Sequence, residues 1–221
     1  MVDRAQLQVL VVDENPLTRF GVLSIANLHP LLHVCDEAAD ARAARELYSR
    51  ENPAVVLLDV TLPHGDGIEL VEEFSQLQPD CRFIVVSELC DHATIERAFH
   101  AGAHGYVSKK DQAAEVLCAL EAVITGGTYM SKLVTECLRA TMSRKLPNRA
   151  LAYIRDLSNR ELHIFRRIGK GQGTTAIARE LGVSVKTIET HQGRMKAKLR
   201  LMTIAQLRIA AASWLAFSLI A

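Results

Sequence analysis

The run Leu7-Gln-Val-Leu-Val-Val12 decides the fold, together with two runs of the same kind, Ala54-Val-Val-Leu-Leu58 and Arg82-Phe-Ile-Val-Val86. Each run is almost continuously apolar instead of alternating between apolar and polar residues. Short continuous apolar runs are typical of β-strands that are covered on both faces, as in a parallel sheet. The sequence therefore predicts a central sheet with helices on both sides.

Segments with helical spacing lie between and after these runs. The predicted helices, each with apolar residues at steps of three and four, are Ala41–Glu51, Ile68–Gln76, Thr94–Ala101 and Ala113–Thr125. Weaker apolar runs at Leu32–Cys35 and Gly105–Val107 predict two more strands. Strands and helices in this alternation predict an α/β domain with a doubly wound, five-stranded parallel sheet of the flavodoxin-like kind.

The distribution of charge divides the chain into two parts. Residues 1–127 hold 20 acidic and 9 basic residues, a net charge of −11, whereas residues 128–221 hold 5 acidic and 17 basic residues, a net charge of +12. A basic domain suits a polyanion, because neutralised phosphates release condensed counterions. We expect one domain over 1–127, a linker with a short helix over 128–152, and a small all-α domain over 153–221.

The second domain shows start and stop signals for several helices. The segment Ser158-Asn-Arg-Glu161 is a capping-box pattern that predicts the start of a helix. Thr174 is expected to cap a second helix, Gly182 to make a turn, and Ser184 to cap a third helix that ends near Leu199.

A last helix is expected from Ile204 to about Leu219. Its apolar seam consists of Leu207, Ala211, Trp214 and Leu215. This seam fits either a dimer interface or packing within the domain, and helical spacing alone does not separate the two.

Several protein classes are disfavoured by the composition. The five cysteines are odd in number and widely spaced, so neither a disulfide framework nor a zinc site is indicated. The chain start carries no basic segment followed by a cleavable apolar stretch, and the apolar tail Ile209–Ala221 is shorter than the roughly 20 residues that span a bilayer. We expect a cytoplasmic protein that does not contact a membrane.

Polar side chains suited to phosphoryl transfer follow four of the predicted strands. Asp13 and Glu14 follow the first strand, and Asp59 follows the third. Ser87 follows the fourth strand and Lys109 the fifth. The carboxyl ends of parallel strands meet at one edge of a sheet, so these side chains are expected to gather there. Carboxylates in such a cluster favour a hard cation such as Mg²⁺, and one of them can attack a phosphoryl donor.

The segments around these residues resemble the receiver domains of response regulators over residues 7–125. They read Val-Val-Asp13-Glu14-Asn-Pro, Leu-Leu-Asp59-Val-Thr-Leu-Pro63-His-Gly-Asp-Gly67, Val-Val-Ser87 and Ala-Gly-Ala-His-Gly-Tyr106-Val-Ser-Lys109. The resemblance implies that a sensor histidine kinase phosphorylates Asp59, with Ser87 and Lys109 against the phosphoryl oxygens. It also implies that Tyr106 changes rotamer together with Ser87. The implied ligands of Mg²⁺ are Asp13, Glu14, Asp59 and the backbone carbonyl of Thr61.

One residue departs from the receiver pattern. Glu88 stands where the family usually has a small or apolar residue. Its negative charge would slow the entry of anionic phosphodonors or disfavour the phosphorylated state. A regulator of the same architecture that works without phosphorylation of Asp59 is therefore kept as the alternative. A phosphatase with an aspartyl-phosphate intermediate is disfavoured, because Thr61 stands where such enzymes usually carry a second Asp, and we expect no metabolic enzyme.

Residues 157–201 resemble the LuxR/NarL-type helix-turn-helix. The match includes Leu157-Ser-Asn-Arg-Glu161, Thr175-Ala-Ile-Ala-Arg-Glu-Leu-Gly-Val-Ser184 and Lys196-Ala-Lys-Leu199. The resemblance implies a transcription regulator of the NarL/FixJ family that binds double-stranded DNA as a homodimer when active. The residues expected to contact DNA are Lys186, Thr187, Glu189, Thr190, Gly193, Arg194, Lys196 and Lys198.

Helical geometry agrees independently with a DNA-reading face. At 100° per residue, one face of the third helix is expected to pack inward and carries Ile188, His191, Met195 and Leu199. The opposite face contains Glu189, which is unexpected near phosphates and is interpreted as an acceptor for a cytosine amino group. Gly193 on the same face either admits close backbone approach or reduces the number of base contacts.

Overall fold

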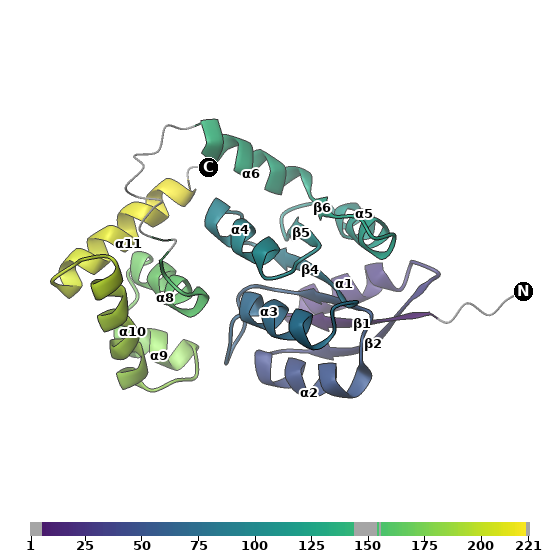
Figure 1. Cartoon of the computed structure of the whole chain (residues 1–221), viewed down its shortest axis with the longest axis horizontal. Coiled ribbons are helices and arrows are strands. Elements are labelled where there is room, and N and C mark those ends of the chain that lie inside the picture. The colour runs from purple at the N-terminus through teal and green to yellow at the C-terminus, as the bar shows by residue number, and fades with distance from the viewer. Residues whose placement is uncertain (1–5, 144–153, 155, 220–221) are drawn as a thin grey trace, which may run out of the picture. The chain divides into compact units, whose positions relative to one another are not determined.

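The structure, a computed structural model of the chain, describes residues 6–143, 154 and 156–219. Contacts divide the chain after Cys137 into two units (Figure 1). The basic stretch at 144–149, which falls in the predicted linker, lies outside the described residues. Each unit is described by itself below.

A parallel sheet forms the centre of the first unit. Its strands among the described residues are β1 (Leu7–Val12), β2 (Leu32–Ala38), β3 (Val55–Leu58), β4 (Arg82–Ser87), β5 (Gly105–Ser108) and β6 (Tyr129–Met130). Their order is β2-β1-β3-β4-β5-β6, and every neighbouring pair is parallel. The five predicted strands and the α/β class are confirmed. The predicted count of five strands is wrong, because the structure adds a sixth, β6. Its two residues are too few to show a periodic pattern.

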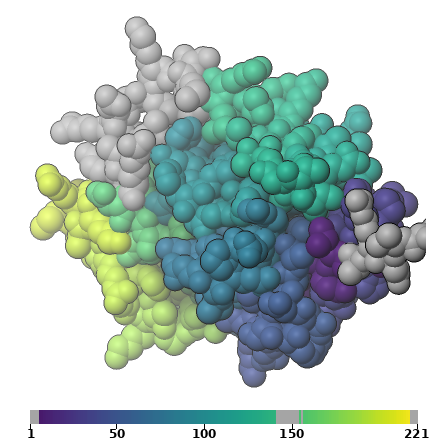
Figure 2. All heavy atoms as spheres, turned by 45° about the vertical axis from the view of Figure 1, so that its right-hand side comes forward, coloured from purple at the N-terminus to yellow at the C-terminus, as the bar shows by residue number. Residues whose placement is uncertain are grey.

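Helices cover both faces of this sheet. They are α1 (Pro16–Ala26), α2 (Ala41–Glu51), α3 (Gly67–Leu77), α4 (His92–His100) and α5 (Ala113–Ile124), and a further helix, α6 (Lys132–Ser143), follows β6 along the chain. Helices α1 and α5 pack together over one face, and their buried side chains join those of the strands in one apolar cluster. Helix α3 packs between α2 and α4. From the side drawn in Figure 2, only a small part of the purple amino-terminal segment is visible.

Helix α1 is missing from the sequence-based prediction. Asn15 caps it by accepting hydrogen bonds from the backbone amides of Leu17 and the next residue, and Pro16 stands at its first position. Its apolar residues face both the core and the solvent: Val22 is buried, whereas Leu17 and Phe20 are 80% and 69% exposed. The apolar spacing is therefore blurred, and only the cap and the proline signal the helix.

The second unit contains four of the predicted helices. They are α8 (Asn159–Gly169), α9 (Thr174–Glu180), α10 (Val185–Lys198) and α11 (Ile204–Leu219). The capping box between Ser158 and Glu161 is present, and Ser184 caps α10 through the backbone amide of Thr187. Gly182 has a φ of 62°, as the predicted turn requires.

The predicted cap at Thr174 is wrong. Gly173 occupies the cap position of α9 and Thr174 is the first helical residue. The hydroxyl of Thr174 instead accepts a hydrogen bond from Gln192 Nε2 at 3.2 Å, which ties α9 to α10. A tertiary contact has replaced the local cap that the sequence suggests.

The apolar seam of α11 packs within its own unit. Leu207, Ala211 and Trp214 are buried, and α11 makes its main contacts with α8. The Trp214 ring lies 5.9 Å from the ring of Phe165, between centroids, and the guanidinium of Arg166 lies 5.2 Å from its centroid. Of the two interpretations of the seam, the structure supports packing within the domain.

Candidate functional site

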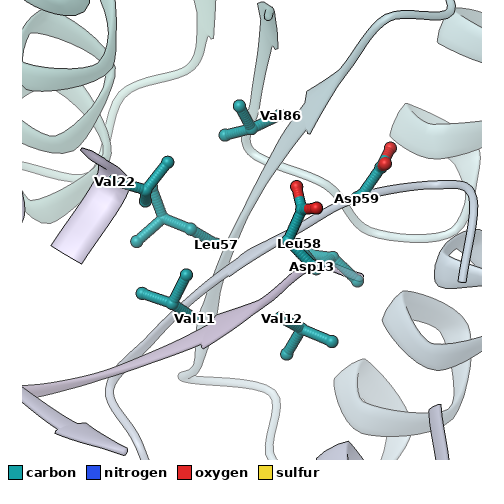
Figure 3. Close-up of a pocket in the computed structure, with 8 residues that line it drawn as sticks. All are labelled: Val11, Val12, Asp13, Val22, Leu57, Leu58, Asp59 and Val86. Atoms are coloured by element: carbon teal, nitrogen blue, oxygen red, sulfur yellow. The ribbon is translucent and has the colours of Figure 1, made fainter. Parts of the chain in front are cut away.

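Two carboxylates lie side by side at the carboxyl edge of the sheet. Asp13 follows β1 directly and Asp59 follows β3, and β1 and β3 are paired neighbours in the sheet. Both residues are buried, with 3% and 5% of their surface exposed. Figure 3 shows both carboxylates beyond the strand ends, with apolar side chains such as Val11, Leu57 and Val86 lining the same pocket. The topology thus brings together two acids that are 46 residues apart in sequence.

Lys109 and Ser87 complete this cluster. The ammonium of Lys109 lies 2.6 Å from Asp13 Oδ2 and 2.7 Å from Asp59 Oδ2. Ser87 Oγ donates a hydrogen bond of 2.6 Å to Asp59 Oδ1. The second oxygen of Asp13 accepts from the backbone amide of Asn15 at 2.8 Å. Each carboxylate is therefore held at both oxygens.

The ionisation of these groups follows from their burial and mutual pairing. Burial raises the pKa of Asp13 above its ordinary value, and the hydrogen bonds from Lys109 and Asn15 only partly oppose this. Burial acts against the charged form of Lys109, but the ion pairs with Asp59 and Asp13 outweigh it and raise the pKa of the amine. Lys109 is thus cationic at neutral pH and supplies fixed positive charge beside the predicted phosphoryl acceptor.

The remaining predicted receiver residues lie around this cluster. Tyr106 is fully buried, and its hydroxyl donates to the Leu89 carbonyl at 2.5 Å. Thr61 is half-buried, whereas Glu14 and Glu88 are exposed. The structure therefore assembles Asp13, Asp59, Ser87 and Lys109 directly, while Glu14 stays at the solvent boundary.

The donors at this edge fit a hard divalent cation. Asp13 and Asp59 already share a single positive charge, the ammonium of Lys109. Carboxylate and carbonyl oxygens are the ligands that Mg²⁺ prefers. Within the described residues, no three side chains of the His, Cys, Asp and Glu types stand in a ready metal-binding arrangement. The exposed Glu14 side chain would have to turn inward to join the ion.

The face of α10 expected to meet DNA is open. Lys186, Glu189, Thr190, Gly193 and Arg194 are all exposed, while Thr187 and Lys196 are half-buried. On the opposite face the predicted inward residues Ile188, Met195 and Leu199 are buried, and His191 is half-buried. Gln192 is also buried, which was not predicted, because a polar residue gives no apolar signal.

Two family models match the chain. Residues 9–121 match the response regulator receiver domain, and residues 155–211 match the bacterial regulatory proteins of the luxR family. The chain belongs to the NarL/FixJ-type response regulators. This family consists of transcriptional regulators and not of metabolic enzymes. The predicted family, its two-component character and its LuxR-type DNA-binding domain are thereby confirmed.

Relatives of this response regulator match over nearly the whole length. It is 30% identical over 207 residues to the transcriptional regulatory protein MctR of Rhizobium johnstonii, covering 94% of each chain. It is 28% identical to the oxygen regulatory protein NreC of Staphylococcus epidermidis, covering 91% of this chain and 94% of the relative.

Solved structures share the fold of this response regulator. RcsB from Salmonella enterica serovar Typhimurium, bound to a promoter, is 22% identical with a TM-score of 0.65, covering 94% of this chain and 99% of that one. A LuxR-family response regulator from Aurantimonas sp. is 31% identical with a TM-score of 0.59, covering 63% and 100%. No helix among the described residues is long and apolar enough to cross a bilayer.

One predicted DNA contact of the response regulator has a partner within its own domain. The ammonium of Lys198 lies 2.7 Å from Glu161 Oε2, and the same carboxylate accepts from the backbone amide of Ser158. Burial acts against the charged form of Glu161, but Lys198 and Ser158 outweigh it and lower the pKa of the carboxyl. This pair joins the end of α10 to the start of α8. A phosphate contact by Lys198 would compete with it.

Proposed function

We propose that this response regulator is phosphorylated on Asp59 by a sensor histidine kinase in the cytoplasm, and that phosphorylation controls dimerisation and binding to promoter DNA. The observation that supports this best is the pairing of Asp59 with both Ser87 and Lys109. An isolated acid after a strand serves as a turn or a helix cap. Asp59 instead accepts from one neutral donor, Ser87, and from one cationic donor, Lys109, as a phosphoryl acceptor requires.

The chemistry follows from these contacts. A carboxylate oxygen of Asp59 attacks the phosphorus of the donor, the bond from phosphorus to the donor's nitrogen breaks, and an acyl phosphate results. Ser87 and Lys109 then donate to phosphoryl oxygens instead of to the carboxylate. Asp13, Glu14, Asp59 and the Thr61 carbonyl would hold Mg²⁺, which supplies charge that stabilises the transferred oxygens.

A switch connects the phosphoryl group to the rest of the receiver. Ser87 contacts Asp59 directly, and two residues further on the Leu89 carbonyl accepts the hydroxyl of Tyr106. A shift of Ser87 toward a phosphoryl oxygen therefore changes the loop that holds Tyr106. Phosphorylation favours one of two arrangements of this loop. It shifts the equilibrium between them because one arrangement contacts the phosphoryl group more favourably than the other.

Dimerisation is assigned to the outer face of α11. Four apolar residues at alternating steps of four and three form this outer stripe: Ala205, Ile209, Ala212 and Ala216. All four are exposed, and Ile209 is 67% exposed. This spacing is that of a helix seam that packs on a second helix. The outer stripe lies away from the buried residues Leu207, Ala211 and Trp214, so both faces can be used at once.

Helix α10 is proposed to enter the major groove. Lys186 and Arg194 supply positive charge on its open face, and the hydroxyl of Thr190 donates to the Lys186 carbonyl, which leaves its methyl group for contact with bases. Nothing lies within 4 Å of the position that a Cβ would take on Gly193. The helix can therefore approach the bases closely at this point.

Glu189→Ala should relax the sequence preference of DNA binding. Glu189 is exposed in the middle of the face, and a carboxylate there repels phosphate but accepts a hydrogen bond from a cytosine amino group. We expect discrimination at one base pair to fall by about 1–3 kcal/mol, with nonspecific binding unchanged or tighter. Selection from random duplexes measures this, with Lys186→Ala as the comparison that weakens binding to all sequences. An unchanged preference for cytosine would refute the role of Glu189.

The phosphorylation proposal is tested with Asp59→Asn. The full chain is incubated with acetyl phosphate and Mg²⁺, acyl phosphate is measured by intact mass, and dimerisation and promoter binding are measured on the same samples. We expect labelling, dimerisation and tighter binding for the wild type and none of the three responses for Asp59→Asn.

Glu88→Ala serves as a companion variant in the same assay. It should be labelled faster than the wild type, because the substitution removes a negative charge from the mouth of the site.

A regulator that works without phosphorylation is the second candidate. The exposed Glu88 beside Ser87 favours it, because anionic donors must pass this charge. Equal dimerisation and DNA binding of wild type and Asp59→Asn, with no labelling of either, would establish this second mode.

A further inference from the structure

Arg19 on α1 contacts the loop that carries two of the predicted metal ligands. Its Nη1 donates to the backbone carbonyl of Asp13 at 2.7 Å and to that of Glu14 at 3.2 Å. Its Nε lies 3.6 Å from a carboxylate oxygen of Glu37 on β2. Only 14% of the Arg19 side chain is exposed. The guanidinium is therefore an enclosed group with three partners, not a solvated surface charge.

An irregularity in β2 brings Glu37 to this arginine. Val9 pairs with Val34, but Leu10 pairs with Asp36, so Cys35 is an extra residue in the ladder. Val34 packs against the apolar cluster on the α1 and α5 face. Strict alternation would place Asp36 on that face next. The extra residue reverses the order, so Glu37 meets Arg19 on α1 while Asp36 pairs with Arg50 on α2.

The contacts of Arg19 fix the peptide groups on both sides of the Glu14 Cα. When both carbonyls are held toward α1, the directions in which the side chains of Asp13 and Glu14 leave the backbone are fixed at the sheet edge. One nitrogen of the planar guanidinium, Nη1, bonds both carbonyls while a second, Nε, faces the Glu37 carboxylate, and a lysine ammonium cannot place its single nitrogen at both points. Hydrogen bonds behind a metal ligand set its orientation, and their loss typically weakens metal binding about 10- to 100-fold.

We infer that Arg19 is a positioning residue for the divalent cation at this edge: by holding the Asp13 and Glu14 carbonyls, it prepares their carboxylates for the ion. This inference rests on the proposed function, because it assumes that Mg²⁺ binds there. It assigns to α1, through a residue outside the acidic cluster, a direct part in the affinity for the cation.

Mg²⁺ titration calorimetry on the full chain tests the inference. We expect Arg19→Met to weaken Mg²⁺ binding about tenfold, and Arg19→Lys to give an affinity between that of Arg19→Met and the wild type. The matched control is Arg42→Met, which removes an arginine whose side chain is 84% exposed in an ion pair with Glu46 on α2. The control should leave the affinity unchanged.

Thermal unfolding in a metal chelator separates positioning from general stability. A purely structural Arg19 would lower the melting temperature of the metal-free protein and leave the Mg²⁺ affinity at the wild-type value, and this result would overturn the inference. If Arg19→Met does not fold, Arg19→Lys decides, since full wild-type affinity with lysine would show that charge alone suffices. Failure of the wild type itself to bind Mg²⁺ would instead count against the proposed function.

Discussion

Gly67→Ala is expected to destabilise the receiver and to slow the phosphorylation of Asp59 strongly. A Cβ on Gly67 would lie 2.0 Å from the Asp59 carbonyl oxygen and 2.9 Å from the Cα of Val60. These neighbours are backbone atoms, and Gly67 is also held by a hydrogen bond from its amide to the Val60 carbonyl. The strand end that carries Asp59 must therefore move. We expect a loss of about 3 kcal/mol of stability and a fall of about a hundredfold in labelling rate.

Urea unfolding followed by circular dichroism, with labelling by acetyl phosphate on the same samples, measures both effects. Gly21→Ala is the matched control, because nothing lies within 4 Å of its added Cβ. Gly21 lies inside α1, so alanine there should raise stability by up to about 1 kcal/mol. A Gly67→Ala protein with wild-type stability and labelling would show that the strand end accommodates the methyl group.

The DNA-binding domain is expected to lose stability as the pH falls below about 6.5, because His163 is buried without charge. Burial lowers the pKa of His163 to about 2, and the nearby cations Arg167 and Arg166 act in the same direction. The unfolded chain takes up a proton near pH 6.5, whereas the folded domain does not. The stabilisation is therefore complete above that pH and decreases by about 1.4 kcal/mol for each lower pH unit. About 2 kcal/mol should be lost between about pH 7 and pH 5.

Trp214 reports this unfolding selectively, since it is the single tryptophan of the chain and lies in α11. Urea titrations of tryptophan fluorescence at several pH values give the slope of the free energy of unfolding against pH. His163→Leu should flatten it, whereas His191→Gln should change it less, because His191 is only half-buried and burial lowers its pKa without a large shift. Working above pH 5 avoids the protonation of Glu161. An equal slope for His163→Leu and the wild type would assign the acid sensitivity to other groups.

The sequence by itself predicted most elements of the receiver and the residues that gather at the edge of its sheet. Continuous apolar runs predicted β1, β3 and β4, because strands buried on both faces have no polar alternation. Asp13, Asp59, Ser87 and Lys109 were predicted to meet, because parallel strands end at one edge whatever their separation along the chain. The capping signals at Ser158 and Ser184 are local and were read correctly.

The tertiary structure decided what depends on contacts between distant segments. Strand β6 forms through backbone pairing with β5, and Thr174 bonds Gln192 instead of capping α9. The seam of α11 could serve a partner or its own domain, and contact with α8 settled this. In the sequence nothing distinguishes Arg19 from an ordinary helix residue. Its pairing with Glu37 depends on the extra residue in β2. Local patterns report each segment's own preferences, whereas these contacts arise from the register and packing of several segments together.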